Sequence, residues 1–154
     1  MRWERAPNTA IQGYLNDNKA PQLFVSSGAD KWNDPKNYPW TMGWLPSYRV
    51  ESRIYAHYIL ENLPGAKIAV LYQNDDFGKD YLIGLREGLG NKADKLIVAT
   101  QSYETTDPTV DSQIVALEAS GANVLSPRPF PNSPPKPFAK FTKSAGSRRT
   151  SYCR

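Results

Sequence analysis

Two groups of neighbouring residues in this 154-residue sequence are of types and spacings that suit chemistry. Asp75 and Asp76 are adjacent, and paired carboxylates can raise one pKa for acid–base work or hold a hard cation. A Ser-Ser-Gly run at residues 26–28 offers hydroxyls and a closely approachable backbone, which supply donors and acceptors to a small polar ligand. The fold has to position these two groups.

The acidic pair also has a structural explanation. Acidic residues just before a helix accept hydrogen bonds from its first amides and complement its dipole, so Asp75 and Asp76 are typical of a helix start. A receiver-like signalling domain that used this pair would need a further Asp at the end of the next strand, where residues 101–103 read Gln-Ser-Tyr. Another doubly wound enzyme using Asp75 and Asp76 is the other alternative.

Residue counts exclude several kinds of site. With one histidine, His57, and one cysteine, Cys153, the chain cannot form a multi-histidine centre, a thiolate metal cluster or an internal disulfide. His57 falls within a helical pattern, which favours a surface or boundary position. We therefore expect no metal centre, and a Ser/His/Asp triad would have to be built around His57.

The formal net charge of +4 comes from the end of the sequence. Residues 126–154 contain seven of the 19 Lys and Arg residues, six of the 13 Pro residues and no Asp or Glu, so the rest of the chain is slightly acidic. The charge therefore does not predict a nucleic-acid partner. No apolar run approaches the roughly 18 residues that span a bilayer. The N-terminus lacks the apolar stretch of a secretory signal, so the sequence as given predicts a cytoplasmic location.

The elements that would position the two groups alternate between strand and helix. Apolar runs of strand length occur at residues 22–25, 68–72, 96–99 and 122–125, with a possible short crossing strand at 41–45. Helical periodicity occurs at residues 8–15, 47–63, 76–89 and 110–117, with Ser47 as a predicted cap. This order with short polar turns predicts an α/β fold built on a doubly wound parallel sheet.

Two expectations concern burial. Val50, Ile54 and Tyr58 recur at a spacing of four residues, which predicts that they face the sheet together with Tyr55, Ile59 and Leu63. The tryptophans around the polar loop at residues 30–40 are expected to be buried in or beneath that loop rather than to stack on a ligand. These are Trp32, Trp40 and Trp44.

Three stretches carry a longer pattern: residues 21–25 (PQLFV), 38–43 (YPWTMG) and 67–81 (KIAVLYQNDDFGKDY). In order and spacing they resemble the substrate-binding proteins of branched-chain amino-acid ABC transporters, over about residues 7–125. In that family, a type I periplasmic binding protein closes two α/β lobes on an amino acid. The resemblance implies that residues 1–46 are the end of the first lobe and the crossover, and residues 47–125 the first half of the second lobe.

In open α/β sheets, ligands bind beyond the carboxyl ends of the strands, where residues 26–29 and 74–78 fall. The resemblance implies Ser27, Ala29 and Phe77 as ligand-binding residues. Ala29 stands where the family uses a hydroxyl residue and Phe77 where many members have tyrosine, so both would make backbone or packing contacts. The simpler alternative is that residues 26–29 are only a strand-to-loop turn. The resemblance also implies an amino acid or small amide as ligand, a membrane permease as partner and the periplasm as location. It further implies a protein that is not an enzyme, with no catalytic residue and no cofactor.

Residues 126–154 differ in character from the rest. Six prolines between residues 126 and 137, and cations without acids, predict a disordered tail. Reading the possible codons one base earlier allows an amphipathic helical peptide, which resembles the segment after this strand in the family. We therefore predict that a one-base shift near codon 125 produced the tail, leaving a fragment. A Pro-rich adaptor that acts through a PxxP segment at residues 131–137 is the alternative.

Overall fold

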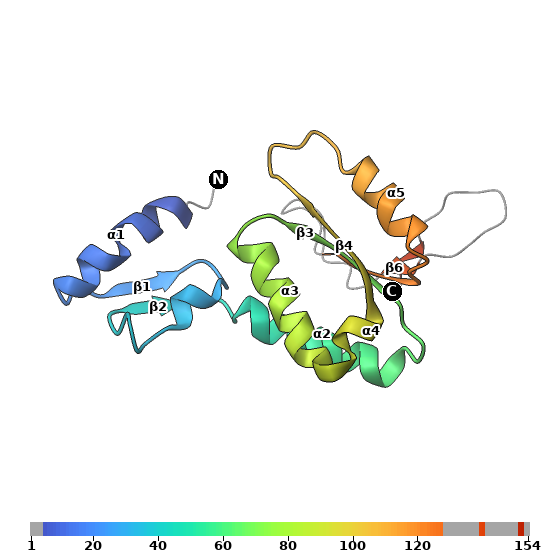
Figure 1. Ribbon diagram of the computed structural model, residues 1–154. Helices are drawn as coiled ribbons and strands as arrows, with labels where there is room; N and C mark the ends of the chain where they lie inside the picture. Colours follow the sequence, from blue (N-terminus) through green and yellow to red (C-terminus); the bar gives the residue numbers. More distant parts are fainter. Residues whose placement is uncertain (1–4, 128–138, 141–150, 153–154) are drawn as a thin grey trace.

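The computed structural model describes residues 5–127, 139–140 and 151–152, and Figure 1 shows their arrangement. The main elements are α1 (Arg5–Asp17), β1 (Gln22–Val25), β2 (Thr41–Gly43), α2 (Tyr48–Asn62), β3 (Ile68–Gln73), α3 (Asp76–Leu89), β4 (Ile97–Tyr103), α5 (Asp111–Ala119) and β5 (Val124–Pro127). Shorter pieces are the 3-10 helices η1 (Asp30–Asn33) and η2 (Gly90–Lys92), helix α4 (Ala93–Leu96), β6 (Ala139–Lys140) and β7 (Ser151–Tyr152). None of the helices in this part of the chain has the length and apolar character of a transmembrane segment.

The first unit consists of α1, β1 and β2, at the left of Figure 1. β1 has the predicted bounds and pairs in parallel with β2, from Gln22 opposite Thr41 to Val25 opposite Gly43. The register shifts between these pairs, and Phe24 has a positive φ of 61°. Polar side chains tie α1 to the strands, because Asn16 Nδ2 donates to Thr41 Oγ1 at 2.7 Å.

The main sheet has the order β4-β3-β5-β6-β7. β3 lies between β4 and β5 and is parallel to both, whereas β6 and β7 are antiparallel additions. The chain passes from β3 to β4 on one side and then returns to β5 on the other. The carboxyl ends of β3 and β5 therefore flank the point at which the strand order reverses, where open α/β sheets bind ligands.

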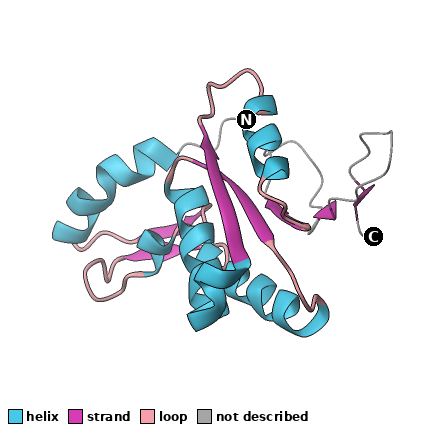
Figure 2. Cartoon of the chain, turned by 45° about the vertical axis from the view of Figure 1, so that its right-hand side comes forward, coloured by secondary structure: helices cyan, strands magenta, loops and turns pink. Residues whose placement is uncertain are grey.

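Helices cover both faces of this sheet, as Figure 2 shows. On one face, α2 and α3 bury Ile59 and Leu85 against Ile68, Val70 and Val124. On the other face, α5 buries Leu117 against Ala69, Leu71 and Leu125. Alternate residues of β3 thus enter opposite cores, which explains its continuous apolar sequence. The predicted doubly wound parallel α/β fold is confirmed.

The inward face of α2 differs from the prediction. Val50, Ile54 and Tyr58 are 42%, 61% and 50% exposed, so the prediction that they face the sheet is wrong. The helix instead buries Tyr48, Ser52, Ala56 and Ile59. Small residues face α3 because the two helices approach closely: a Cβ added to Gly84 of α3 would lie 2.6 Å from the Cα of Arg49.

One of the three loop tryptophans is buried and two are exposed. Trp32 is 1% exposed, as predicted, and belongs to a buried cluster with Val25, Ala29 and Tyr48. Trp40 and Trp44 are 39% and 64% exposed, so the prediction is wrong for both. Trp44 packs edge-to-face on Phe24, with ring centroids 5.3 Å apart.

The last parallel strand extends past the predicted start of the tail. β5 continues through Ser126 and Pro127, which lie opposite Val70 and Leu71 of β3. Beyond it, β6 and β7 are short paired strands, and the rest of the predicted disordered tail lies outside the described residues.

Candidate functional site

The acidic pair begins α3, as one of the two sequence explanations requires. Asp75 is the N-cap: its Oδ1 accepts from the Gly78 amide at 3.1 Å, and its Oδ2 accepts from Gln73 Nε2 at 2.5 Å. Asp76 is exposed and pairs with Lys31 at 2.7 Å. In the described part of the chain, no group of three or more acidic, histidine or cysteine side chains could hold a metal ion. The carboxylates therefore serve the helix start and a surface ion pair.

The loop after β1 is folded tightly on itself. Ser27 and Ala29 are each 1% exposed, and Ser27 Oγ accepts from the Ala29 amide at 3.2 Å. The Ser27 amide donates to the Val25 carbonyl at 2.8 Å. The amide and the hydroxyl of Ser27, which the resemblance implies as a ligand-binding residue, therefore both have partners inside the loop. Ser26 is exposed and is the hydroxyl of this turn that faces outward.

Tyr48 connects this loop to the start of α3. A Cβ added to Gly28 would lie 2.6 Å from the Tyr48 ring, so only glycine lets the ring approach the backbone there. The Tyr48 amide donates to the Gly28 carbonyl at 2.8 Å. On its other side, the ring packs edge-to-face on Phe77, with centroids 4.9 Å apart. The structure thus brings the turn that contains Ser27 and Ala29 together with Phe77, through Tyr48.

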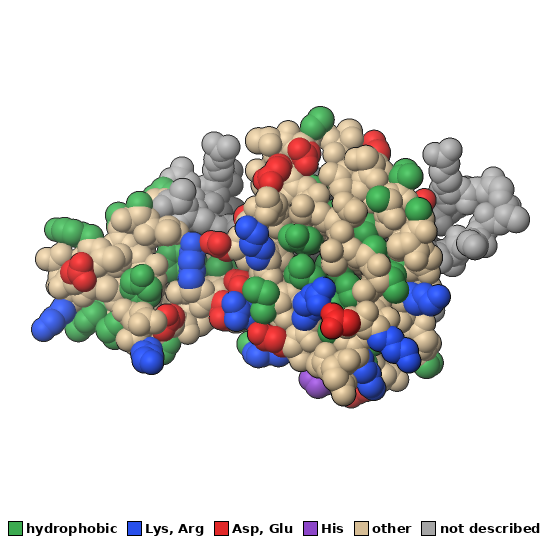
Figure 3. All heavy atoms as spheres, in the orientation of Figure 1, with side chains coloured by type: hydrophobic (Ala, Val, Ile, Leu, Met, Phe, Trp, Pro, Cys, Tyr) green, Lys and Arg blue, Asp and Glu red, His purple; other side chains and the backbone are tan. Residues whose placement is uncertain are grey.

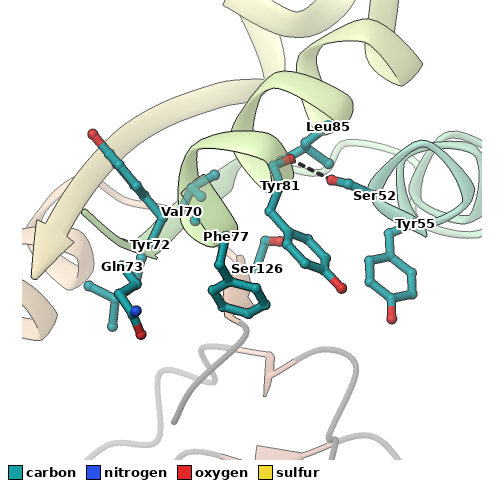
Figure 4. A pocket seen from close by; sticks show the side chains of 11 residues that line it. Ser52, Tyr55, Val70, Tyr72, Gln73, Phe77, Tyr81, Leu85 and Ser126 are labelled. Atoms are coloured by element: carbon teal, nitrogen blue, oxygen red, sulfur yellow. Dashed lines mark hydrogen bonds between the residues drawn. The ribbon is translucent and has the colours of Figure 1, made fainter. Parts of the chain in front are cut away.

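An aromatic hollow lies at the carboxyl ends of β3 and β5 on the α2–α3 face. Its volume is about 30 Å³, room for roughly one water molecule. The rings of Phe77, Tyr81 and Tyr55 point in the same direction, with Ser126 of β5 beside them (Figure 4). Among the described residues, no charged side chain lines this hollow, so it suits an apolar or neutral group of a ligand.

A larger polar cleft lies on the other side of the first turn of α3. Its volume is about 520 Å³, and charged side chains gather at this junction between the first unit and the main sheet (Figure 3). Ala29 lines this cleft, whereas Phe77 lines the aromatic hollow. Asp34 at the rim accepts from Asn37 Nδ2 at 2.6 Å, which lowers the pKa of the Asp34 carboxyl.

Sequence reasoning located the two loops but missed the residues that join them. The sequence analysis assigns no role to Tyr48, and it places Ser126 only at the start of the Pro-rich segment. A signal for Tyr48 was present: the aromatic residues Tyr48, Tyr55, Phe77 and Tyr81 are spaced to share one side of two adjacent helices. β4 ends with Gln-Ser-Tyr at residues 101–103. The further Asp that a receiver-like signalling domain would need at the end of this strand is therefore missing.

Comparison with solved structures shows the same fold in larger proteins. A periplasmic binding protein from Burkholderia mallei aligns with a TM-score of 0.66 and 15% identity, over 79% of this chain and 32% of that one. A branched chain amino acid ABC transporter periplasmic ligand-binding protein from Burkholderia xenovorans aligns with a TM-score of 0.52 and 18% identity, over 75% and 30%. The chain thus spans about a third of the length of these proteins.

Sequence comparison gives the same family. No curated protein sequence matches the chain significantly. The chain does match the periplasmic binding protein family over residues 3–147, which extends at both ends beyond the resemblance noted at residues 7–125. Because this match covers most of the 154 residues, the chain belongs to the periplasmic binding protein family.

Proposed function

We propose that the chain supplies part of the solute-binding component of an amino-acid ABC transport system, with a branched-chain amino acid or a related amide as ligand. The observation that supports this most is the convergence of the loop after β1 and the loop after β3 on Tyr48. Two strand-end loops that meet beside the point of strand-order reversal are placed as a ligand site requires. The Burkholderia xenovorans protein of similar fold carries the corresponding name.

The ligand contacts divide by chemistry. We assign the exposed Ser26 hydroxyl to one polar end of the ligand. In the turn that holds Ser27 and Ala29, only the backbone groups outside the internal hydrogen bonds would be available to the other end. Phe77, at the edge of the aromatic hollow, would contact its apolar side chain or neutral amide. The hollow itself has room for about one water-sized group, and no charged side chain of the described residues lines it. The family is one of solute-binding proteins and not an enzyme class. Delivery to a membrane permease and action in the periplasm follow from the same proposal.

Affinity is expected to be low for this chain by itself. Two or three charge-assisted hydrogen bonds of about 1.5–3 kcal/mol each have to offset an association cost of about 4–15 kcal/mol. Titration calorimetry with leucine, isoleucine, valine and acetamide should give Kd values in the millimolar range, with glutamate and lysine weaker. A submicromolar Kd for leucine would contradict the idea that the described residues form only one wall. Equal affinity for glutamate would contradict the neutral hollow.

We also propose that a one-base shift near codon 125 accounts for residues 126–154. Support comes from the change in composition at that point and from the helical peptide that the other frame allows. The family match to the sequence in its given frame reaches residue 147, and this observation weighs against the shift. Sequencing the gene tests the proposal directly: the shifted frame should encode an open amphipathic helix, and a stop codon within it would refute the shift.

A further inference from the structure

The loop that follows β1 is joined to α3 by a carboxylate 50 residues away in sequence. Asp80 faces this loop, and its side chain is only 11% exposed. Its Oδ2 accepts from the backbone amide of Asp30 at 2.8 Å, and its Oδ1 accepts from Arg49 Nε at 3.2 Å. Asp30 comes directly after Ala29, so this contact fixes the end of the turn that the proposed function assigns to the ligand.

The side chain of Asp30 is held from a third element. Ser47 Oγ donates to Asp30 Oδ1 at 2.9 Å and also accepts from the Arg49 amide at 3.2 Å as the N-cap of α2. Arg49 Nε lies 3.6 Å from Asp30 Oδ2, and Arg49 Nη1 lies 3.7 Å from Glu87 of α3. One guanidinium thus neutralises carboxylates from the loop and from α3.

We propose that Asp80 is a positioning residue for the ligand loop, which acts through the Asp30 amide and Arg49. This proposal rests on the proposed function, because it concerns the loop assigned there to the ligand. The contact itself can be tested without any ligand. A charged acceptor with little exposure makes a stronger hydrogen bond than a neutral one, and removing it leaves the Asp30 amide and Arg49 without this partner.

Amide hydrogen exchange of the full chain tests this contact. In Asp80→Ala, amides of residues 28–33 should exchange about 10- to 100-fold faster, as expected for the loss of one charge-assisted hydrogen bond. Amides of β3 and β4 should keep their rates. Lys79→Ala is the matched control. Lys79 is exposed, lines the polar cleft that Asp80 also lines, and has no ion pair among the described residues. This control should change neither region.

Charge-conserving and paired variants separate positioning from general stability. Asp80→Glu should restore part of the slow exchange. Arg49→Gln should speed loop exchange more than Asp80→Asn, because it leaves the Asp30 and Asp80 carboxylates without their shared cation. Combining Arg49→Gln with Asp80→Asn should give slower loop exchange than Arg49→Gln by itself, since one repelling charge is gone.

Two results would overturn the proposal. One is unchanged exchange at residues 28–33 in Asp80→Ala, or in Asp80→Asn if the alanine variant does not fold. The other is an equal acceleration in the loop and in β3 and β4, which would mean that Asp80 stabilises the whole fold and has no specific hold on the loop. Neither depends on whether an amino acid binds, so failure of the proposed function is read separately by calorimetry.

Discussion

Replacing Gly78 with alanine is expected to lower the free energy of unfolding by about 3 kcal/mol, the upper part of the usual range for overpacking. A Cβ at this position would overlap the Gln73 carbonyl oxygen and lie 2.6 Å from the Gln73 nitrogen. Both are backbone atoms of the central strand β3, so neither can rotate away as a side chain could. The first turn of α3 would have to move off the strand end, which also disturbs the Asp75 cap.

The matched control for Gly78→Ala is the same substitution in α1. Gly13 lies inside that helix, and a Cβ there would meet no atom within 4 Å. Gly13→Ala should therefore raise stability by up to about 1 kcal/mol through helix propensity and lower unfolded-state entropy. Denaturant unfolding of both variants measures the difference. Equal effects of the two substitutions would show that the close approach at Gly78 does not exist in solution.

Ile59→Ala should cost about 2–5 kcal/mol, the range for truncating a fully buried aliphatic side chain. Ile59 is 0% exposed and packs in the core between α2 and β3. Because α3 covers the same core, the neighbouring side chains have little freedom to collapse into the space left behind. Thermal or denaturant unfolding gives the change directly.

Ile54→Ala in the same helix is the control for this second substitution. Ile54 is 61% exposed, so its truncation should change the free energy of unfolding by no more than about 0.5 kcal/mol. The pair decides which face of α2 is inward. If Ile54→Ala were the more destabilising variant, the helix would be rotated relative to the structure, and the face predicted from periodicity would be the inward one.

The inward face of α2 cannot be predicted from hydrophobic periodicity alone. Two apolar stripes coexist on α2, one through Val50 and Ile54 and one through Ile59, and hydropathy favours the wrong one. The choice is made by α3, whose Gly84 lets the backbone of Arg49 approach closely and whose Gly88 does the same for Ala56. Contact between two helices thus outweighs the size of the apolar side chains, and no single-helix pattern contains that information.

Other features were local enough to be read from sequence. The continuous apolar run of β3 needs two covered faces, and Ser47 and Asp75 cap the helices that follow them, as their residue types predict. Only part of the candidate site could be predicted from the sequence. Its loops follow strand ends, but their junction depends on Tyr48 reaching both Gly28 and Phe77, a contact set by the packing of three elements.

The most direct test of the account is an amide-resolved NMR titration of the full chain with leucine. We expect saturable shift changes confined to residues 26–30 and 74–78, with cross-relaxation from the leucine methyl groups to the Phe77 ring. Shift changes that cluster elsewhere, or none up to the solubility limit of leucine, would contradict the placement of the ligand wall at these two loops.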